Sequence, residues 1–226
     1  MQEGVAFHDL ALAIVDEQHR FGVHQRLALR GKGAAQDVVP HQLVMTATPI
    51  PRTLAMAAYA DLDVSAIDEL PPGRTPVHTV ALSADRRPDL VERIRNACAE
   101  GRQAYWVCTL IDDSDEVIAQ AAQSTFEALS AALPALRIGL VHGRMKAGVK
   151  QATMRAFKDG ALDLLVATTV IEVGVDVANA SLMIVENAER LGLAQLHQLR
   201  GRVGRGSAAS SCVLLYQSPL SQLARQ

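Results

Sequence analysis

The sequence lacks several features that would each place a protein in a recognisable class. It has three cysteines, an odd number without any Cys-x-x-Cys pair, which argues against a disulfide framework and favours a reducing, cytoplasmic compartment. No apolar stretch reaches the roughly 18 residues that cross a bilayer, so no membrane contact is expected. Internal repeats and low-complexity tracts are also missing, which excludes a repeat array.

Positive charge is scarce as well. The 22 Lys and Arg residues face 24 Asp and Glu, for a formal net charge of −2. Proteins that bind nucleic acid through their overall field are basic, so any such contact here must come from a local patch. Residues 1–72 hold 5 basic against 9 acidic side chains, which leaves 17 against 15 for the remainder, and the second part is therefore mildly basic.

Short apolar runs instead recur along the chain, separated by stretches of helical periodicity. Apolar residues make up 49% of the sequence, enough for a packed core. Strands that alternate with helices form a parallel sheet, so the predicted fold is α/β, a doubly wound parallel sheet. The predicted strands are residues 10–15, 42–45, 78–82, 104–108, 137–141, 164–167, 182–185 and 212–216, and the predicted helices are residues 86–99, 116–132 and 150–158.

The cluster Pro71-Pro72-Gly73-Arg74-Thr75-Pro76 interrupts this rhythm. Prolines there fix an extended path that a helix cannot follow, so we interpret residues 71–76 as a linker between residues 1–70 and 77–226. Six predicted strands follow the linker, enough for a whole domain, whereas only two precede it. We therefore expect an incomplete first domain, whose strand residues are less buried than their composition suggests; these are Ile14, Val15, Leu43 and Val44.

Two polar segments follow the first two predicted strands. Asp16 and Glu17 end the first strand, at the edge of a parallel sheet where ligands bind. One carboxylate there can hold Mg²⁺ while the other polarises a water, as in phosphoryl transfer, although a solvated acidic turn also explains the pair. Thr46 and Thr48 follow the second strand and either link the acidic site to domain movement or, for Thr48, cap the helix that Pro49 opens.

Cationic and hydroxyl side chains follow two later strands. His142 and Arg144 come after one of them, beside a glycine that allows close backbone approach. Contact with phosphate is one interpretation of this pair, and a solvated basic loop is the other. Thr168 and Thr169 end the next strand, where hydroxyls and the start of a short helix offer donors to phosphates or form an ordinary turn.

The most specific segment is 198–206, in which Arg200, Arg202 and Arg205 are interspersed with three glycines. Arginine is always charged and forks onto phosphate oxygens. Surface charge by itself would not require the glycines. The segment therefore favours contact with the charge that develops on a transferring phosphate.

Taken in order, these segments resemble the motifs of superfamily 2 helicases. Within that superfamily, residues 16–26 are similar to the RecG family of ATP-dependent DNA helicases. Residues 16–19 resemble motif II, 46–48 motif III, 105–108 motif IV, 167–176 motif V and 198–205 motif VI. The resemblance implies RecA-like lobes: the C-terminal part of the first lobe in residues 1–70 and the second lobe in residues 77–226.

The resemblance also implies a role for individual side chains in a protein that uses ATP and Mg²⁺. It assigns catalysis to Asp16, Glu17, Arg202 and Arg205, nucleotide binding to Asp16, Gly174, Asp176, Gln198, Arg202 and Arg205, the metal to Asp16, coupling to Thr46 and Thr48, and contact with the DNA backbone to His142, Arg144, Thr168 and Thr169.

The implied function is an ATP-dependent DNA helicase or translocase, a monomer that remodels branched DNA in recombination and repair. No Gly-x-x-x-x-Gly-Lys-Ser/Thr loop occurs, since Gly31-Lys32 is followed by Gly33, so the chain alone is expected to be inactive. A transcription-repair coupling translocase is an alternative, although that family usually has an acidic residue where Gln18 stands. A non-catalytic DNA-binding module and an RNA-unwinding relative are the others.

Overall fold

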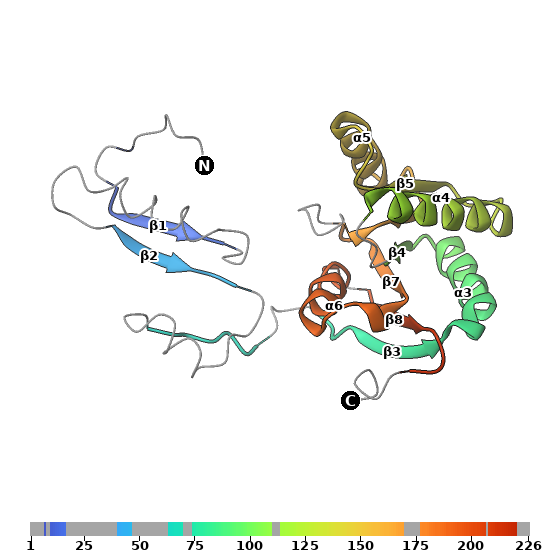
Figure 1. Cartoon of the computed structure of the whole chain (residues 1–226). Coiled ribbons are helices and arrows are strands. Elements are labelled where there is room, and N and C mark those ends of the chain that lie inside the picture. The colour runs from blue at the N-terminus through green and yellow to red at the C-terminus, as the bar shows by residue number, and fades with distance from the viewer. Residues whose placement is uncertain are drawn as a thin grey trace. The chain divides into compact units, whose positions relative to one another are not determined.

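The computed structural model of the chain describes residues 7, 10–16, 40–46, 63–69, 74–109, 114–169, 177–206 and 208–220. Its contacts divide the chain into two units, Met1–Ala66 and Ile67–Gln226, each with its own parallel sheet (Figure 1). Each unit is described by itself. The linker expected at residues 71–76 stays a prediction, because part of it lies outside the described residues.

The first unit contains two parallel strands, β1 (Leu12–Val15) and β2 (His41–Val44). One face of this pair is more open than a parallel sheet usually allows, since Ile14 is 59% and Leu43 50% exposed. The expected low burial is confirmed at these two positions. At Val15 the expectation was wrong, because this side chain lies on the covered face and is only 6% exposed.

The second unit contains a six-stranded sheet in which every strand pairing is parallel. The spatial order is β3-β8-β7-β4-β6-β5, so the chain crosses over repeatedly between strands. All eight strands predicted from the sequence are present in the two units. The six strands of this sheet are β3 (His78–Ser83), β4 (Gln103–Cys108), β5 (Ile138–Val141), β6 (Leu164–Ala167), β7 (Ala180–Glu186) and β8 (Ser211–Tyr216).

Within the described residues, four α-helices and two short 3₁₀ helices connect the strands of this sheet. They are η3 (Ala84–Arg86), α3 (Arg87–Ala99), α4 (Asp115–Ala132), α5 (Ala147–Lys158), η5 (Ala188–Arg190) and α6 (Leu193–Arg200). The hydroxyl of Ser114 accepts hydrogen bonds from the first N–H groups of α4, and Gly160 follows α5 at φ +75°. The sequence did not predict α6, because eight residues are too few for a clear helical periodicity.

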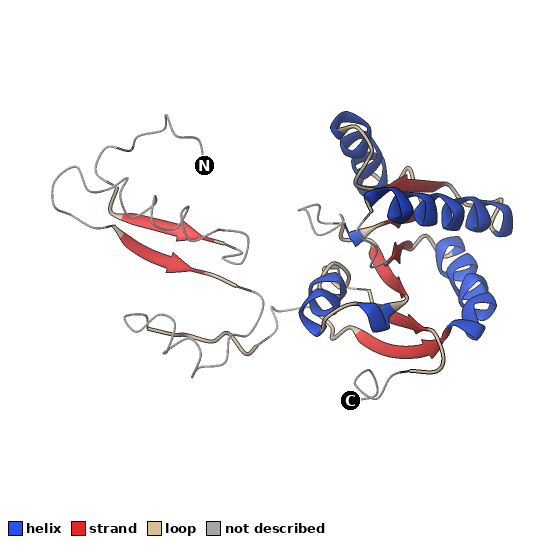
Figure 2. Ribbon diagram, viewed as in Figure 1, coloured by secondary structure: helices blue, strands red, loops and turns tan. Residues whose placement is uncertain are grey.

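Helices cover both faces of the six-stranded sheet (Figure 2). Alternation along β4 makes two separate cores. Tyr105 and Val107 pack with Phe157 of α5 and Leu199 of α6. Ala104, Trp106 and Cys108 face the other way, toward α3 and α4. The doubly wound arrangement predicted from the sequence is therefore confirmed.

The three cysteines are buried as free thiols. Burial raises the pKa of Cys98 and of Cys212 to about 11 and that of Cys108 to about 12. These thiols are therefore neutral at physiological pH and act as small apolar side chains. Within the described residues, no helix is both long enough and apolar enough to span a membrane.

Candidate functional site

In the first unit, Asp16 and Thr46 lie at one edge of the two-stranded sheet. β1 and β2 run in register from Leu12 and His41 to Val15 and Val44, and the N–H of Met45 donates to the carbonyl of Val15 at 2.8 Å. Asp16 and Thr46 directly follow these strand ends. The structure thus brings together two of the four residues predicted here, while Glu17 and Thr48 lie outside the described residues.

In the second unit, His142 and Thr168 occupy the carboxyl edge of the sheet. They follow β5 and β6, which pair with Val141 opposite Ala167, and the N–H of Thr168 donates to the carbonyl of Val141 at 3.1 Å. The two predicted residues therefore stand at neighbouring strand ends. Thr169 is the next residue along the same edge.

Each of these two side chains has a buried polar atom without a hydrogen-bond partner. The atoms are Nδ1 of His142 and Oγ1 of Thr168, and Thr168 is 2% exposed. An unpaired buried polar group costs about 1 to 3 kcal/mol and calls for an explanation. Burial, with the charges of Arg144 and Lys150, lowers the pKa of His142, so the imidazole is held neutral.

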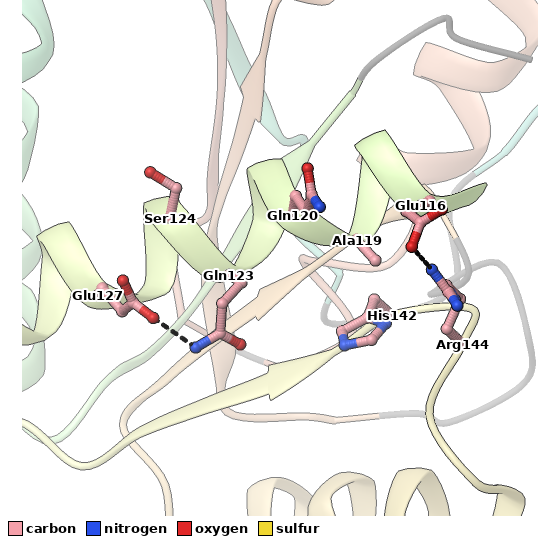
Figure 3. Close-up of a pocket in the computed structure, with 8 residues that line it drawn as sticks. All are labelled: Glu116, Ala119, Gln120, Gln123, Ser124, Glu127, His142 and Arg144. Carbon is pink, nitrogen blue, oxygen red and sulfur yellow. Dashed lines mark hydrogen bonds and ion pairs between the residues drawn. The ribbon is translucent and has the colours of Figure 1, made fainter. Parts of the chain in front are cut away.

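A groove of about 380 Å³ separates His142 and Arg144 from helix α4 (Figure 3). Arg144 crosses one end of it, where its Nη1 lies 2.8 Å from Oε1 of Glu116. Farther along α4, Nε2 of Gln123 donates to Oε1 of Glu127 at 2.8 Å. The sequence analysis did not single out Glu116, because nothing in the local pattern connects it to an arginine 28 residues later.

A cationic patch continues from Arg144 into the first turn of α5. Arg144 and Lys146 are exposed, and Nζ of Lys150 donates to the carbonyl of Gly143 at 3.3 Å. Helix α5 has no acidic residue in its first turn and no side-chain cap, so its positive dipole end adds to the patch. The second part of the chain thus gathers part of its basic charge beside His142.

The predicted motif IV segment, residues 105–108, is the buried end of strand β4 and packs beneath the carboxyl edge of the sheet. Trp106 is fully buried, and its indole N–H donates to the carboxylate of Glu186 at 2.9 Å. The same carboxylate lies 3.2 Å from Nε of Arg87, whose guanidinium stacks 5.0 Å from the Trp106 ring centre. This cluster ties the carboxyl ends of β4 and β7 to the start of α3.

The arginines of residues 198–206 lie at the amino edge of the sheet, where the parallel strands begin. Arg202 and Arg205 belong to the loop between the end of α6 and the start of β8, and Gln198 is in the last turns of α6. Nε of Arg205 donates to the carbonyl of Gly201 at 3.2 Å, so its side chain lies along the loop. All six strands are parallel, which separates these arginines from His142 by the length of the sheet.

The two edges are connected through the predicted motif V segment. Thr169 stands at the carboxyl edge and Val177, three residues before β7, at the amino edge. Gly174 and Asp176 belong to residues 170–176 between them and lie outside the described residues. Their predicted contact with a nucleotide stays a prediction.

Comparison with known proteins gives the family. The helicase conserved C-terminal domain matches residues 87–207, more than half of the chain. The chain belongs to this family. The match runs from the start of α3 through the Arg202–Arg205 loop, and so includes both edges of the six-stranded sheet.

Several relatives are known by name. The chain is 71% identical over 225 residues to the ATP-dependent DNA helicase RecG of Escherichia coli K12, covering 99% of this chain and 32% of the relative. It is 68% identical to RecG of Haemophilus influenzae, covering 100% of this chain and 33% of that protein. The chain therefore spans about a third of the length of these curated relatives.

Solved structures agree with this family. A RecG structure bound to a three-way DNA junction is 44% identical, with a TM-score of 0.75, and the match covers 99% of this chain and 28% of that one. A Mycobacterium smegmatis Lhr helicase structure is 22% identical with a TM-score of 0.63, covering 92% and 28%, and shows the shared fold. The resemblance to superfamily 2 helicases and the RecA-like fold are both confirmed.

Proposed function

We propose that this chain is part of an ATP-dependent DNA helicase or translocase that remodels branched DNA, such as stalled forks and Holliday junctions, during recombination and repair. The observation that carries the proposal is the presence of two separate cationic sites on opposite edges of one sheet. Arg144, Lys146 and Lys150 form one, and Arg202 and Arg205 form the other. A motor of this kind needs distinct sites for nucleic acid and nucleotide.

The amino-edge arginines would act on the nucleotide. Bound ATP, with Mg²⁺, would supply the phosphoryl group, and transfer of this group to water would drive movement. Arg202 and Arg205 would stabilise the charge that develops on that group, a contribution typically worth a 10³- to 10⁵-fold change in rate. Gln198 at the end of α6, with Gly174 and Asp176, would bind the nucleotide beside them.

The first unit would supply the metal and the water. Asp16 offers an exposed carboxylate at a strand end, a hard oxygen ligand suited to Mg²⁺, which keeps most of its waters. Glu17 would orient the attacking water. Thr46, on the same edge as Asp16, would couple nucleotide state to lobe movement together with Thr48. This assigns residues 1–70 to the C-terminal part of a first lobe, and residues 77–226 to the second.

The carboxyl edge would track the DNA backbone. Lys150 and Arg144 provide charge, while His142, Thr168 and Thr169 provide donors at neighbouring strand ends. The buried Nδ1 of His142 and Oγ1 of Thr168, which have no hydrogen-bond partner, would gain one if the lobe engaged a phosphate and the atoms covering them moved. Contacts to phosphate rather than bases suit a motor that must pass along any sequence. We expect the protein to act as a monomer in the cytoplasm.

Arg205→Ala tests the nucleotide site in the full-length protein expressed from its native gene. We expect DNA-stimulated ATP hydrolysis to fall at least about 10³-fold while ATP affinity changes little, because the guanidinium acts on charge that develops during transfer. Steady-state kinetics and equilibrium binding of an ATP analogue measure the two quantities.

Arg200→Ala is the matched control, since it removes an exposed arginine of the same segment. Its hydrolysis rate should stay close to that of the unmodified protein. A parallel loss of ATP affinity and rate in Arg205→Ala would contradict the assignment, and full hydrolysis in Arg205→Ala would remove Arg205 from the reaction. Absence of DNA-stimulated hydrolysis in the unmodified full-length protein would favour a module that only binds DNA.

A further inference from the structure

Residues 74–78, just before strand β3, lie directly beside the loop between α6 and β8 that carries Arg202 and Arg205. Nε of Arg74 donates to the carbonyl of Gly204 at 3.0 Å, in a partly buried contact between residues 130 positions apart. Four residues later, the N–H of His78 donates to the carbonyl of Ser210 at 2.9 Å. Residues 74–78 therefore lie along the loop before β3 begins to pair with β8.

The loop is also constrained by its own backbone. Gly204 has φ +75°, and a Cβ there would lie 2.7 Å from Cγ2 of Val77. At Gly206, a Cβ would lie 2.5 Å from the carbonyl oxygen of Ala178. Both glycines are thus required by close approach, Gly204 to the incoming chain and Gly206 to the turn before β7.

Arg74 holds the centre of this loop. Gly204 lies between Arg202 and Arg205, so the hydrogen bond fixes the backbone from which both guanidinium groups extend. The donor is charged, which makes the bond stronger than one between neutral groups. In the part of the chain that the structure describes, no carboxylate forms an ion pair with Arg74, so the Gly204 carbonyl is the acceptor that orients it.

We propose that Arg74 is a positioning residue for Arg202 and Arg205, and that it makes their placement depend on the path of the chain that enters the second unit. Resting on the proposed function, this means that loss of the Arg74 contact lets the loop move and so draws the arginines away from the transferring phosphate. A displacement of about 1 Å at a catalytic group is enough to change a rate by up to roughly 10²-fold.

Hydrogen exchange tests whether Arg74 anchors the loop of residues 201–206, and this test does not depend on enzymatic activity. In Arg74→Ala, amides of residues 201–206 should exchange at least about tenfold faster, because the loop loses its central anchor. Exchange in β4, remote from the loop, should not change. Arg86→Ala is the control, since it removes an exposed arginine whose ion-pair partner is Asp89 at 2.6 Å. Unchanged exchange at residues 201–206 in Arg74→Ala would overturn the proposal.

Kinetics of the full-length protein test the consequence. Arg74→Ala should lower kcat for DNA-stimulated ATP hydrolysis about tenfold, with KM for ATP, DNA affinity and melting temperature unchanged. Arg74→Lys, which keeps one donor, should recover part of the loss. In a background that lacks both Arg202 and Arg205, Arg74→Ala should lower any remaining rate no further, because the arginines that it positions are absent.

The outcomes separate this inference from the proposed function. Faster exchange at residues 201–206 with an unchanged kcat in Arg74→Ala would overturn the positioning role. A melting temperature that falls together with kcat in both Arg74→Ala and Arg74→Lys would also overturn it in favour of a purely structural contact. Faster exchange in a protein that shows no DNA-stimulated hydrolysis even when unmodified would support the anchor and refute the proposed function.

Discussion

Arg144 has an acidic partner that it must exchange for a phosphate if it contacts DNA. The pair with Glu116 is exposed, with 51% of the arginine and 65% of the glutamate side chain accessible. Ion pairs of this kind contribute about 0.2 to 1 kcal/mol and are screened by salt. The carboxylate therefore acts as a weak internal competitor of DNA at one end of the groove.

Glu116→Gln should raise DNA affinity about two- to fivefold at low salt, because the competitor of the phosphate loses its charge. The gain should shrink as salt increases. Fluorescence anisotropy with a labelled DNA duplex at several salt concentrations measures both effects.

Glu127→Gln provides the control on the same helix and in the same groove, where the carboxylate accepts from Gln123. It removes the same charge without touching Arg144, so its effect should be smaller. Equal gains from the two variants would show that net charge, and not release of Arg144, changes the affinity.

If His142 contacts the DNA backbone as proposed, we expect DNA binding to depend on pH. Burial, Arg144 and Lys150 lower the pKa of His142, so the ring stays neutral in the fold at pH values at which an imidazole with the ordinary pKa of 6.5 is already largely protonated. A nearby phosphate would raise that pKa, so binding would take up a proton and affinity would rise as the pH falls toward the pKa of His142. The charged groups beside the ring are Arg144 and Lys150, and Glu116 lines the same groove.

The expected gain reaches about tenfold for a pKa rise of about one unit on binding. His142→Gln, which keeps hydrogen-bonding groups but does not titrate, should give a flatter pH profile of DNA affinity. Anisotropy titrations at constant ionic strength measure the two slopes. Identical slopes would place the proton uptake on another group and remove His142 from the DNA contact.

Among the elements, β5 is packed so closely against its neighbours that a side chain at Gly139 would require them to move. A Cβ at Gly139 would lie 2.6 Å from Cδ1 of Leu162, 3.1 Å from Cγ2 of Thr153 and 3.2 Å from Cδ1 of Leu165. Helix α5 and strand β6 thus approach β5 closely. This packing holds the strand end from which His142 extends.

Gly139→Ala should lower the free energy of unfolding by about 1 to 3 kcal/mol, because three neighbours must move at once. Gly148→Ala, in the first turn of α5, meets nothing within 4 Å and should raise it by up to about 1 kcal/mol. Urea denaturation of the second unit followed by circular dichroism compares the two. A Gly139→Ala variant as stable as the unmodified protein would mean that the neighbours of Gly139 move aside at no cost.

The edges of β5 and β6 are also tied together by charge. Asp163 accepts from the backbone N–H of Arg137 at 2.8 Å and from its Nη2 at 2.6 Å, and these hydrogen bonds lower the pKa of Asp163. The carboxylate form is therefore favoured in the fold. The ionised carboxylate stabilises the fold at pH values above the ordinary aspartate pKa of 3.8. This stabilisation is lost as the pH falls through the lower pKa that Asp163 has in the folded protein.

At the scale of the whole molecule, the two units differ in how completely their sheets are covered. Both faces of the six-stranded sheet are packed, whereas one face of the β1–β2 pair leaves Ile14 and Leu43 at least half exposed. Stability within a protein follows such differences in burial. We therefore expect the two units to open separately.

Phe157→Ala tests this separation. Phe157 is fully buried and meets Tyr105 edge to face at 4.9 Å, so the change should lower the unfolding free energy of the second unit by about 3 to 5 kcal/mol. Hydrogen exchange should accelerate in β4 and β6 but not in β1. Leu193→Ala, at a residue 86% exposed, should have an effect within about 0.5 kcal/mol. Acceleration of β1 in Phe157→Ala would show that the units unfold together.

Much of the fold was predictable from local sequence. Period and composition identified every strand and the three longer helices, because a buried parallel strand such as residues 164–167 is a short continuous apolar run. Helix α6 was missed because it is short. The motif residues at strand ends were also found, since the carboxyl ends of parallel strands share an edge.

The sequence by itself determined the strands, the doubly wound class and the residue types that suit phosphate, because these depend on patterns within a few residues. The tertiary structure decided which of those residues meet. It placed His142 and Arg205 at opposite edges, paired Glu116 with Arg144 and anchored Gly204 to Arg74. Contacts between residues 28 or 130 positions apart depend on the order of strands in the sheet, which no local pattern encodes.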